Sequence, residues 1–153
     1  EVRAAVDRGE TSFLDVVKGL GVRLDLNALT VFARWITPAM MPKRFDTWFY
    51  LAVAPEDQLA ACDGRETVDA TWIEPAEAVR KAHSGERKVI FPTRMNLQLL
   101  AEAVSAGDAT ARARARTLVT VLPVVEDRPE GKVLVIPNDA GYGDVAEPLS
   151  ALA

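Results

Sequence analysis

Two β-like segments separated by a proline loop constrain the fold more than any other feature of this sequence. Residues 29–36 are mostly apolar at both odd and even positions, a pattern typical of a strand that is buried on both faces. Pro38 and Pro42 then interrupt the chain, and prolines placed in this way indicate a loop. Residues 47–53 include three consecutive aromatic residues, which favour a strand. We therefore expect two neighbouring strands joined by a loop, within a mixed or antiparallel sheet.

The rest of the chain predicts helices with short strands between and after them. Residues 67–73 alternate in polarity, so we expect a third strand there, with Trp72 packed in the core. Candidate N-caps, whose side-chain oxygens accept hydrogen bonds from the first helical amides, are Thr11, Ser12, Thr93 and Asp108. We expect helices over residues 1–20 in two pieces, 75–84, 94–106 and 108–117, a hairpin formed by 118–125 and 132–137, and irregular structure from 138 onwards. This order predicts an α+β fold.

Composition limits the classes of function. The chain has 153 residues, which favours one domain. Its net charge of −4 argues against a general nucleic-acid binder, which needs a basic surface. Cys62 and His83 are the only residues of their types, which excludes an internal disulfide, a cysteine-based zinc site and any mechanism with two histidines. No apolar run approaches the length of a membrane span. We expect a cytoplasmic protein without nucleic-acid or membrane partners.

Four charged residues are candidates for a functional site. Arg44 and Asp46 lie at the start of the aromatic strand, and Arg44 suits phosphate because a guanidinium donates two parallel hydrogen bonds. Arg94 lies in the first turn of a predicted helix, where an anionic ligand or a carboxylate would offset its unfavourable interaction with the helix dipole. Glu66 precedes the predicted third strand. The structural alternatives are a salt bridge from Arg44 to Asp46 or another carboxylate, simple exposure of Arg94, and an exposed turn position for Glu66.

The order of these motifs resembles that of the Nudix hydrolases, and is most similar to the branch that includes the peroxisomal coenzyme A diphosphatases. The resemblance rests on Arg44-Phe45-Asp46-Thr47, then Glu66, then Trp72 and Glu74-Pro75. It implies an α/β/α sandwich with a mixed sheet. It also implies hydrolysis of a nucleoside diphosphate linked to another moiety, such as coenzyme A or a related nucleotide, with Mg²⁺ or Mn²⁺ as cofactor. Under this resemblance Glu66 is a metal ligand or general base, and Arg44, Asp46 and Arg94 are substrate contacts.

The sequence contains no Nudix box, the motif whose helix carries most of the metal-binding glutamates in that family. We therefore expect a single domain that is incomplete at its N-terminus and inactive on its own. Its parts are a helical insertion or leader over residues 1–28, a core over 29–107, and a C-terminal helix, hairpin and tail over 108–153. Missing strands would leave an open sheet edge, so we expect a homodimer. The alternatives are an inactive Nudix-like nucleotide-binding or oligomerising module, and an unrelated structural domain.

Overall fold

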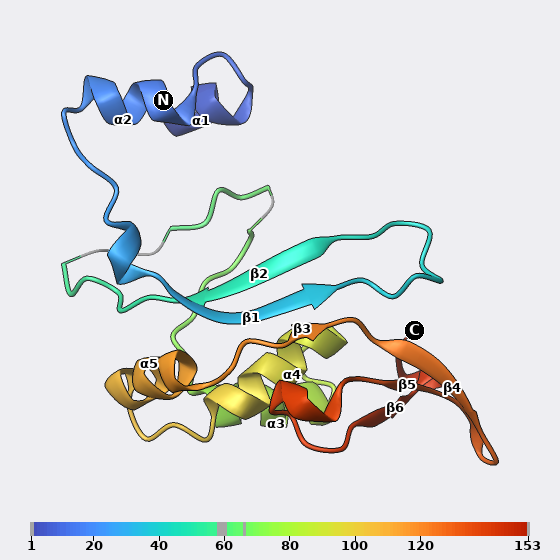
Figure 1. Ribbon diagram of the computed structural model, residues 1–153. Coiled ribbons are helices and arrows are strands. Elements are labelled where there is room, and N and C mark those ends of the chain that lie inside the picture. Colours follow the sequence, from blue (N-terminus) through green and yellow to red (C-terminus); the bar gives the residue numbers. More distant parts are fainter. Residues whose placement is uncertain (1, 58–60, 66, 153) are drawn as a thin grey trace.

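The computed structural model describes residues 2–57, 61–65 and 67–152, and it forms an α+β fold with two three-stranded sheets (Figure 1). The helices are α1 (Val2–Asp7), α2 (Phe13–Gly19), α3 (Pro75–His83), α4 (Phe91–Leu100) and α5 (Ala106–Ala115), with 3₁₀ turns η1 (Leu26–Ala28), η2 (Asn138–Ala140) and η3 (Leu149–Leu152). The strands are β1 (Thr30–Ile36), β2 (Asp46–Leu51), β3 (Thr120–Val121), β4 (Val124–Arg128), β5 (Gly131–Val135) and β6 (Ala146–Pro148). The predicted fold class is confirmed.

The first sheet is mixed, as predicted, with the order β2-β1-β3. β1 pairs antiparallel with β2, from Thr30 opposite Leu51 to Ile36 opposite Asp46. β1 also pairs with β3, in parallel. In Figure 1, α3, α4 and α5 lie on one side of the β1–β2 hairpin, and α1 and α2 lie on the other. The sheet thus brings the start of β2 and the end of β1 to one edge of the molecule.

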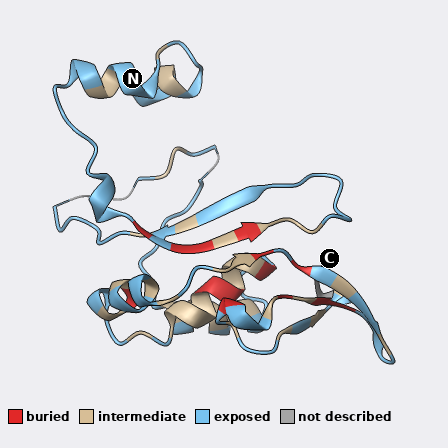
Figure 2. Cartoon of the chain, in the orientation of Figure 1, coloured by how far each residue is buried: buried red, intermediate tan, exposed pale blue. Residues whose placement is uncertain are grey.

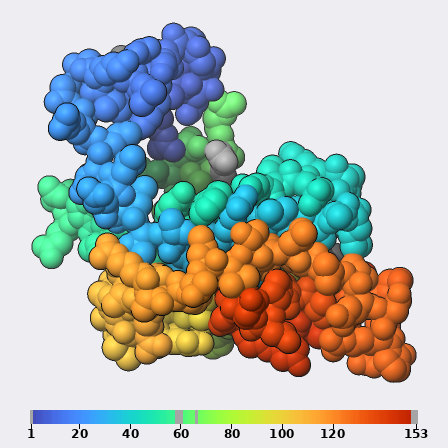
Figure 3. All heavy atoms as spheres, in the orientation of Figure 1, coloured from blue at the N-terminus to red at the C-terminus, as the bar shows by residue number. Residues whose placement is uncertain are grey.

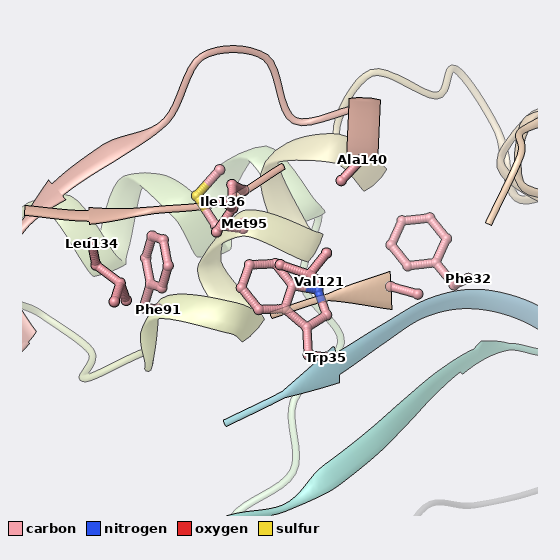
Figure 4. Close-up of a cluster of buried hydrophobic side chains, with 9 residues drawn as sticks. Phe32, Trp35, Phe91, Met95, Val121, Leu134, Ile136 and Ala140 are labelled. Atoms are coloured by element: carbon pink, nitrogen blue, oxygen red, sulfur yellow. The ribbon is translucent and has the colours of Figure 1, made fainter. Parts of the chain in front are cut away.

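The core lies between the first sheet, α4 and β5, and the buried residues in Figure 2 concentrate there. Trp35 packs edge-on against Phe91 with ring centroids 5.7 Å apart, and against Tyr142 at 5.4 Å. Figure 4 shows Trp35 beside Phe91 and Val121 in this cluster. The Trp35 indole N–H donates to the Tyr142 hydroxyl at 3.2 Å, and that hydroxyl donates to Asn96 Oδ1 at 2.6 Å. The core therefore contains one polar chain that links β1, α4 and the C-terminal segment.

The opposite side of the β1–β2 hairpin is open, so the expectation that residues 29–36 are buried on both faces is wrong. Val31, Trp48 and Tyr50 are exposed there, at 36%, 42% and 51%. We call this surface the open face; it consists of Val31, Arg34, Asp46, Trp48 and Tyr50. Neither α1 nor α2 contains a buried residue. In the space-filling view these two helices form a lobe that stands away from the C-terminal part of the chain (Figure 3).

The N-terminal ends of the helices confirm one predicted cap and correct two others. Ser12 caps α2, because its side chain accepts a hydrogen bond from the amide of Leu14. Thr93 does not cap α4, which already begins at Phe91 and carries Pro92 in its first turn. Ser105 caps α5, and Asp108 instead lies within its first turn. Both helices therefore begin two or three residues earlier than the sequence predicted.

The predicted third strand over residues 67–73 is wrong. The described residues of this segment are irregular, and Trp72, expected in the core, is 81% exposed. Val68 is 80% exposed. The physical reason is that alternation makes a segment suited to a sheet, but a strand forms only where a partner strand satisfies its backbone groups. No described strand pairs with this segment.

The C-terminal third forms the second sheet, which is antiparallel with the order β4-β5-β6. The predicted hairpin is confirmed as β4 and β5, but it begins at Val124, because the preceding β3 pairs with β1 instead. The tail is not wholly irregular, since β6 pairs with β5. Among the described residues, no helix is both long enough and apolar enough to cross a membrane.

Candidate functional site

The loop between β1 and β2 is held closed at its base by hydrogen bonds between Thr37 and the residues before β2. The Phe45 amide donates to Thr37 Oγ1 at 3.0 Å, and the Thr37 amide donates to the Phe45 carbonyl at 3.0 Å. Arg44 Nε donates to the Thr37 carbonyl at 3.0 Å. Lys43 lies over the Phe45 ring at 5.1 Å. The loop therefore places two adjacent cations, Lys43 and Arg44, just before the start of β2.

Asp46 pairs with Arg34, so the alternative of a salt bridge between Asp46 and Arg44 is wrong. Arg34 Nε donates to Asp46 Oδ1 at 3.0 Å, and Arg34 Nη2 donates to Oδ2 at 2.7 Å. These hydrogen bonds lower the pKa of the Asp46 carboxyl and raise the pKa of Arg34. The Arg34 guanidinium also lies 4.8 Å from the centre of the Trp48 ring, a cation–π contact.

Sequence reasoning missed Arg34. It sits in the middle of an apolar strand, where a charged residue is uncommon, and that was the available signal. The strand register decides which residues lie opposite Arg34. It places Trp48 directly opposite, and it places Asp46 opposite Ile36, two residues further along β1. This register could not be predicted from the sequence.

Arg94 has a carboxylate partner, which is one of the three explanations expected for a cation in the first turn of α4. Arg94 Nη2 lies 2.5 Å from Glu147 Oε1 of β6, and the two side chains are only 16% and 20% exposed. The Arg94 guanidinium also lies 5.6 Å from the centre of the Phe91 ring. This pair joins α4 to the second sheet and gives Arg94 a structural role.

Arg44 differs from these two arginines. Within residues 2–57, 61–65 and 67–152 no carboxylate pairs with it, and its one hydrogen bond is to a backbone carbonyl. Arg44 is also exposed. A guanidinium that keeps most of its donors available can bind an anion such as a phosphate. The geometry therefore favours Arg44 over Arg94 as an anion contact.

The described residues do not form a metal centre. Glu66, the predicted metal ligand and catalytic residue, lies outside the described residues. In the part of the chain that the structure describes, no three His, Cys, Asp or Glu side chains gather closely enough to hold an ion. A Mg²⁺ or Mn²⁺ site needs several oxygen ligands, so these residues do not fit such a group.

Comparison with known proteins identifies the family. A family model described as the NUDT19 Nudix domain matches residues 1–99. The chain is also 28% identical over 145 residues to a human protein named acyl-coenzyme A diphosphatase NUDT19, with 92% of this chain and 39% of that protein covered. The chain thus spans about two fifths of the length of this relative. No solved structure matches. The motif order from Arg44 to Pro75, the mixed sheet and the match over residues 1–99 agree, and the chain belongs to the NUDT19 Nudix domain family.

Proposed function

We propose that this chain is part of a Nudix hydrolase that cleaves the diphosphate bond of a nucleoside diphosphate linked to another moiety, with coenzyme A or a related nucleotide as substrate. The observation that carries the proposal is Arg44, an exposed guanidinium without a carboxylate partner among the described residues. Membership of the Nudix family supports the reaction class. The name of the human relative, an acyl-coenzyme A diphosphatase, supports the substrate class.

Arg44 acts in this proposal by binding the diphosphate oxygens. A guanidinium binds two phosphate oxygens at once, which fixes the orientation of the group as well as neutralising its charge. Asp46 acts indirectly. It pairs with Arg34, which lies over the Trp48 ring, and so it does not compete with a ligand for Arg44. Arg94 remains a predicted substrate contact in addition to its ion pair with Glu147.

The divalent cation, Mg²⁺ or Mn²⁺, belongs to the proposal on family grounds. When bound, such an ion would neutralise charge on the diphosphate. The described residues do not offer a set of ligands for it, so Glu66 remains the predicted ligand and general base of this chain. The remaining carboxylates would come from a Nudix box, which this sequence does not contain.

An inactive Nudix-like module that binds a nucleotide or oligomerises is the second candidate function. The lack of a carboxylate cluster among the described residues favours it, and so does the open face with its exposed Trp48 and Tyr50. Large exposed apolar patches often mark protein interfaces. Homodimerisation remains a prediction under either function. So do the cytoplasmic location, which the single cysteine favours, and the three-part domain organisation.

Turnover and binding, measured side by side, separate the two functions. We expect the 153-residue chain to bind coenzyme A without efficient hydrolysis in Mg²⁺ or Mn²⁺. We expect a protein that joins this chain to a segment with a Nudix box to release the two phosphate monoesters, detected by chromatography. In that protein Glu66→Gln should lower turnover more than affinity, while the matched control Glu56→Gln should change neither. Efficient turnover by the chain alone would mean that other residues build the metal site, and a complete lack of coenzyme A binding by both proteins would refute the proposal.

A further inference from the structure

A groove of about 530 Å³ lies where the end of β2 meets the start of α3 and the junction of α4 and α5. Leu51, Leu100 and Ala103 contribute to its walls, together with the buried Ala109. Val53 and Val104, which also line it, are 69% and 90% exposed. Small-molecule sites are typically concave, mostly apolar and of about this volume. An apolar ligand that covers the exposed apolar side chains of such a groove removes their surface from water, and this favours binding.

Charge determines which kind of apolar ligand fits this groove. The charged side chain among the lining residues is Glu74, and it forms no ion pair within the described part of the chain. Its carboxylate disfavours a phosphate or a free fatty acid in the groove, because like charges repel. An uncharged chain carries no such penalty. The lining therefore selects a neutral apolar group.

We propose that this groove holds the acyl chain of an acyl thioester of coenzyme A. This rests on the proposed function, since it assumes a diphosphate bound at Arg44. The name of the human relative includes an acyl group, but the assignment of this groove comes from its lining and from its distance to Arg44.

The distance between the two sites matches the ligand. Asp46, two residues after Arg44, and Leu51, which lines the groove, are the two ends of β2. These ends are ~16 Å apart at the rise of an extended strand. The pantetheine arm joins the diphosphate to the thioester through about 13 bonds, which span ~16 Å when extended, as four to five peptide residues do. A diphosphate at Arg44 therefore brings the thioester to the groove if the arm follows β2.

β2 offers a suitable path for this arm. It is the outer strand of its sheet in the described part of the chain, and an outer strand has backbone N–H and C=O groups without partners. The two amides of the pantetheine arm can pair with such groups, as an added peptide strand does. The arm would thus be held by the backbone and the acyl chain by the groove.

Four probes test the groove separately from the nucleotide site: octanoyl- and acetyl-coenzyme A, and octanoyl- and acetyl-pantetheine. Their affinities for the 153-residue chain are measured by calorimetry. Each methylene that becomes buried raises affinity about fourfold. We therefore expect each octanoyl probe to bind at least about tenfold more tightly than its acetyl counterpart, because two buried methylenes suffice for this.

Val53→Asp and Val104→Asp place a carboxylate at exposed positions of the groove and should abolish this preference. Val124→Asp, at a 53% exposed position that does not line the groove, is the matched control and should retain it. Far-ultraviolet circular dichroism checks that each variant is folded. Equal affinity for octanoyl and acetyl probes in the unmodified chain would overturn the groove proposal, and so would a preference that survives both groove variants. Equal affinity of coenzyme A and pantetheine thioesters would instead overturn the proposed nucleotide site and leave the groove standing.

Discussion

Arg34 and Asp46 form a two-point ion pair across β1 and β2, and this pair leaves Arg44 without a carboxylate partner among the described residues. The two positively charged groups therefore have different roles. Arg34 is neutralised by Asp46 and lies against Trp48. Arg44, at the base of the loop, retains most of its hydrogen-bond donors for an anion.

The Arg34–Asp46 pair predicts a defined pH dependence. The pKa of Asp46 is lowered, chiefly by its hydrogen bonds from Arg34. A carboxyl group with a lowered pKa in the folded state stabilises the fold fully above its ordinary pKa, and this contribution is lost as the pH falls through the lowered value. Arg34→Met should therefore raise the Asp46 pKa toward the ordinary value, as measured by carboxyl ¹³C NMR titration. An Asp46 pKa that is the same in both proteins would contradict the pairing.

Tyr142→Phe should destabilise the protein. The change removes the hydroxyl that accepts from Trp35 and donates to Asn96, so two core groups lose a partner at a cost of about 1–3 kcal/mol. Urea denaturation measures the change in the free energy of unfolding. Tyr50→Phe is the matched control, because Tyr50 is 51% exposed and surface changes usually stay within about 0.5 kcal/mol. Equal effects of the two substitutions would show that the polar chain in the core adds no stability.

Much of the fold could be predicted because local sequence determines it. The aromatic run at the start of β2 and Pro75 at the start of α3 each favour one local structure, and the structure confirms both. Strand pairing depends instead on distant residues. The segment containing Trp72 has a strand pattern but no described partner strand, and Ala146–Pro148 has no strand pattern but pairs with β5.

The candidate site could be predicted only in part, for the same reason. Arg44 and Asp46 were found because they lie beside a recognisable loop and strand. Arg34 was missed because its partner is set by the β1–β2 register, twelve residues along the chain. Glu147 is 53 residues from Arg94, and nothing near either residue indicates their pairing.

The ion pair between Arg94 and Glu147 should contribute to stability. Arg94→Met leaves the Glu147 carboxylate, which is only 20% exposed, without its partner. We expect a loss of about 1–3 kcal/mol in the free energy of unfolding, measured by urea denaturation. The double variant Arg94→Met/Glu147→Gln should recover part of this loss, because it removes the unpaired charge. If the double variant is as unstable as the sum of the single variants, the two side chains do not interact.

The open face should mediate self-association. Tyr50 and Trp48 are exposed on it, and large apolar side chains exposed together on a surface favour association. We expect a dimer in sedimentation velocity at micromolar concentration, and a monomer for Tyr50→Lys. Val124→Lys, on the second sheet, should remain dimeric. A monodisperse monomer of the unmodified chain would contradict the predicted homodimer.

The affinity of coenzyme A for Arg44 variants tests the central claim most directly. Calorimetry would compare the unmodified chain with Arg44→Ala, and with Arg128→Ala as a control, since Arg128 pairs with Glu126 on the β4–β5 hairpin. Hydrogen bonds to a charged group are worth about 1.5–3 kcal/mol, so Arg44→Ala should weaken binding roughly 10- to 150-fold, and the control should not. Unchanged affinity in Arg44→Ala, or an equal loss in Arg128→Ala, would show that Arg44 does not hold the diphosphate.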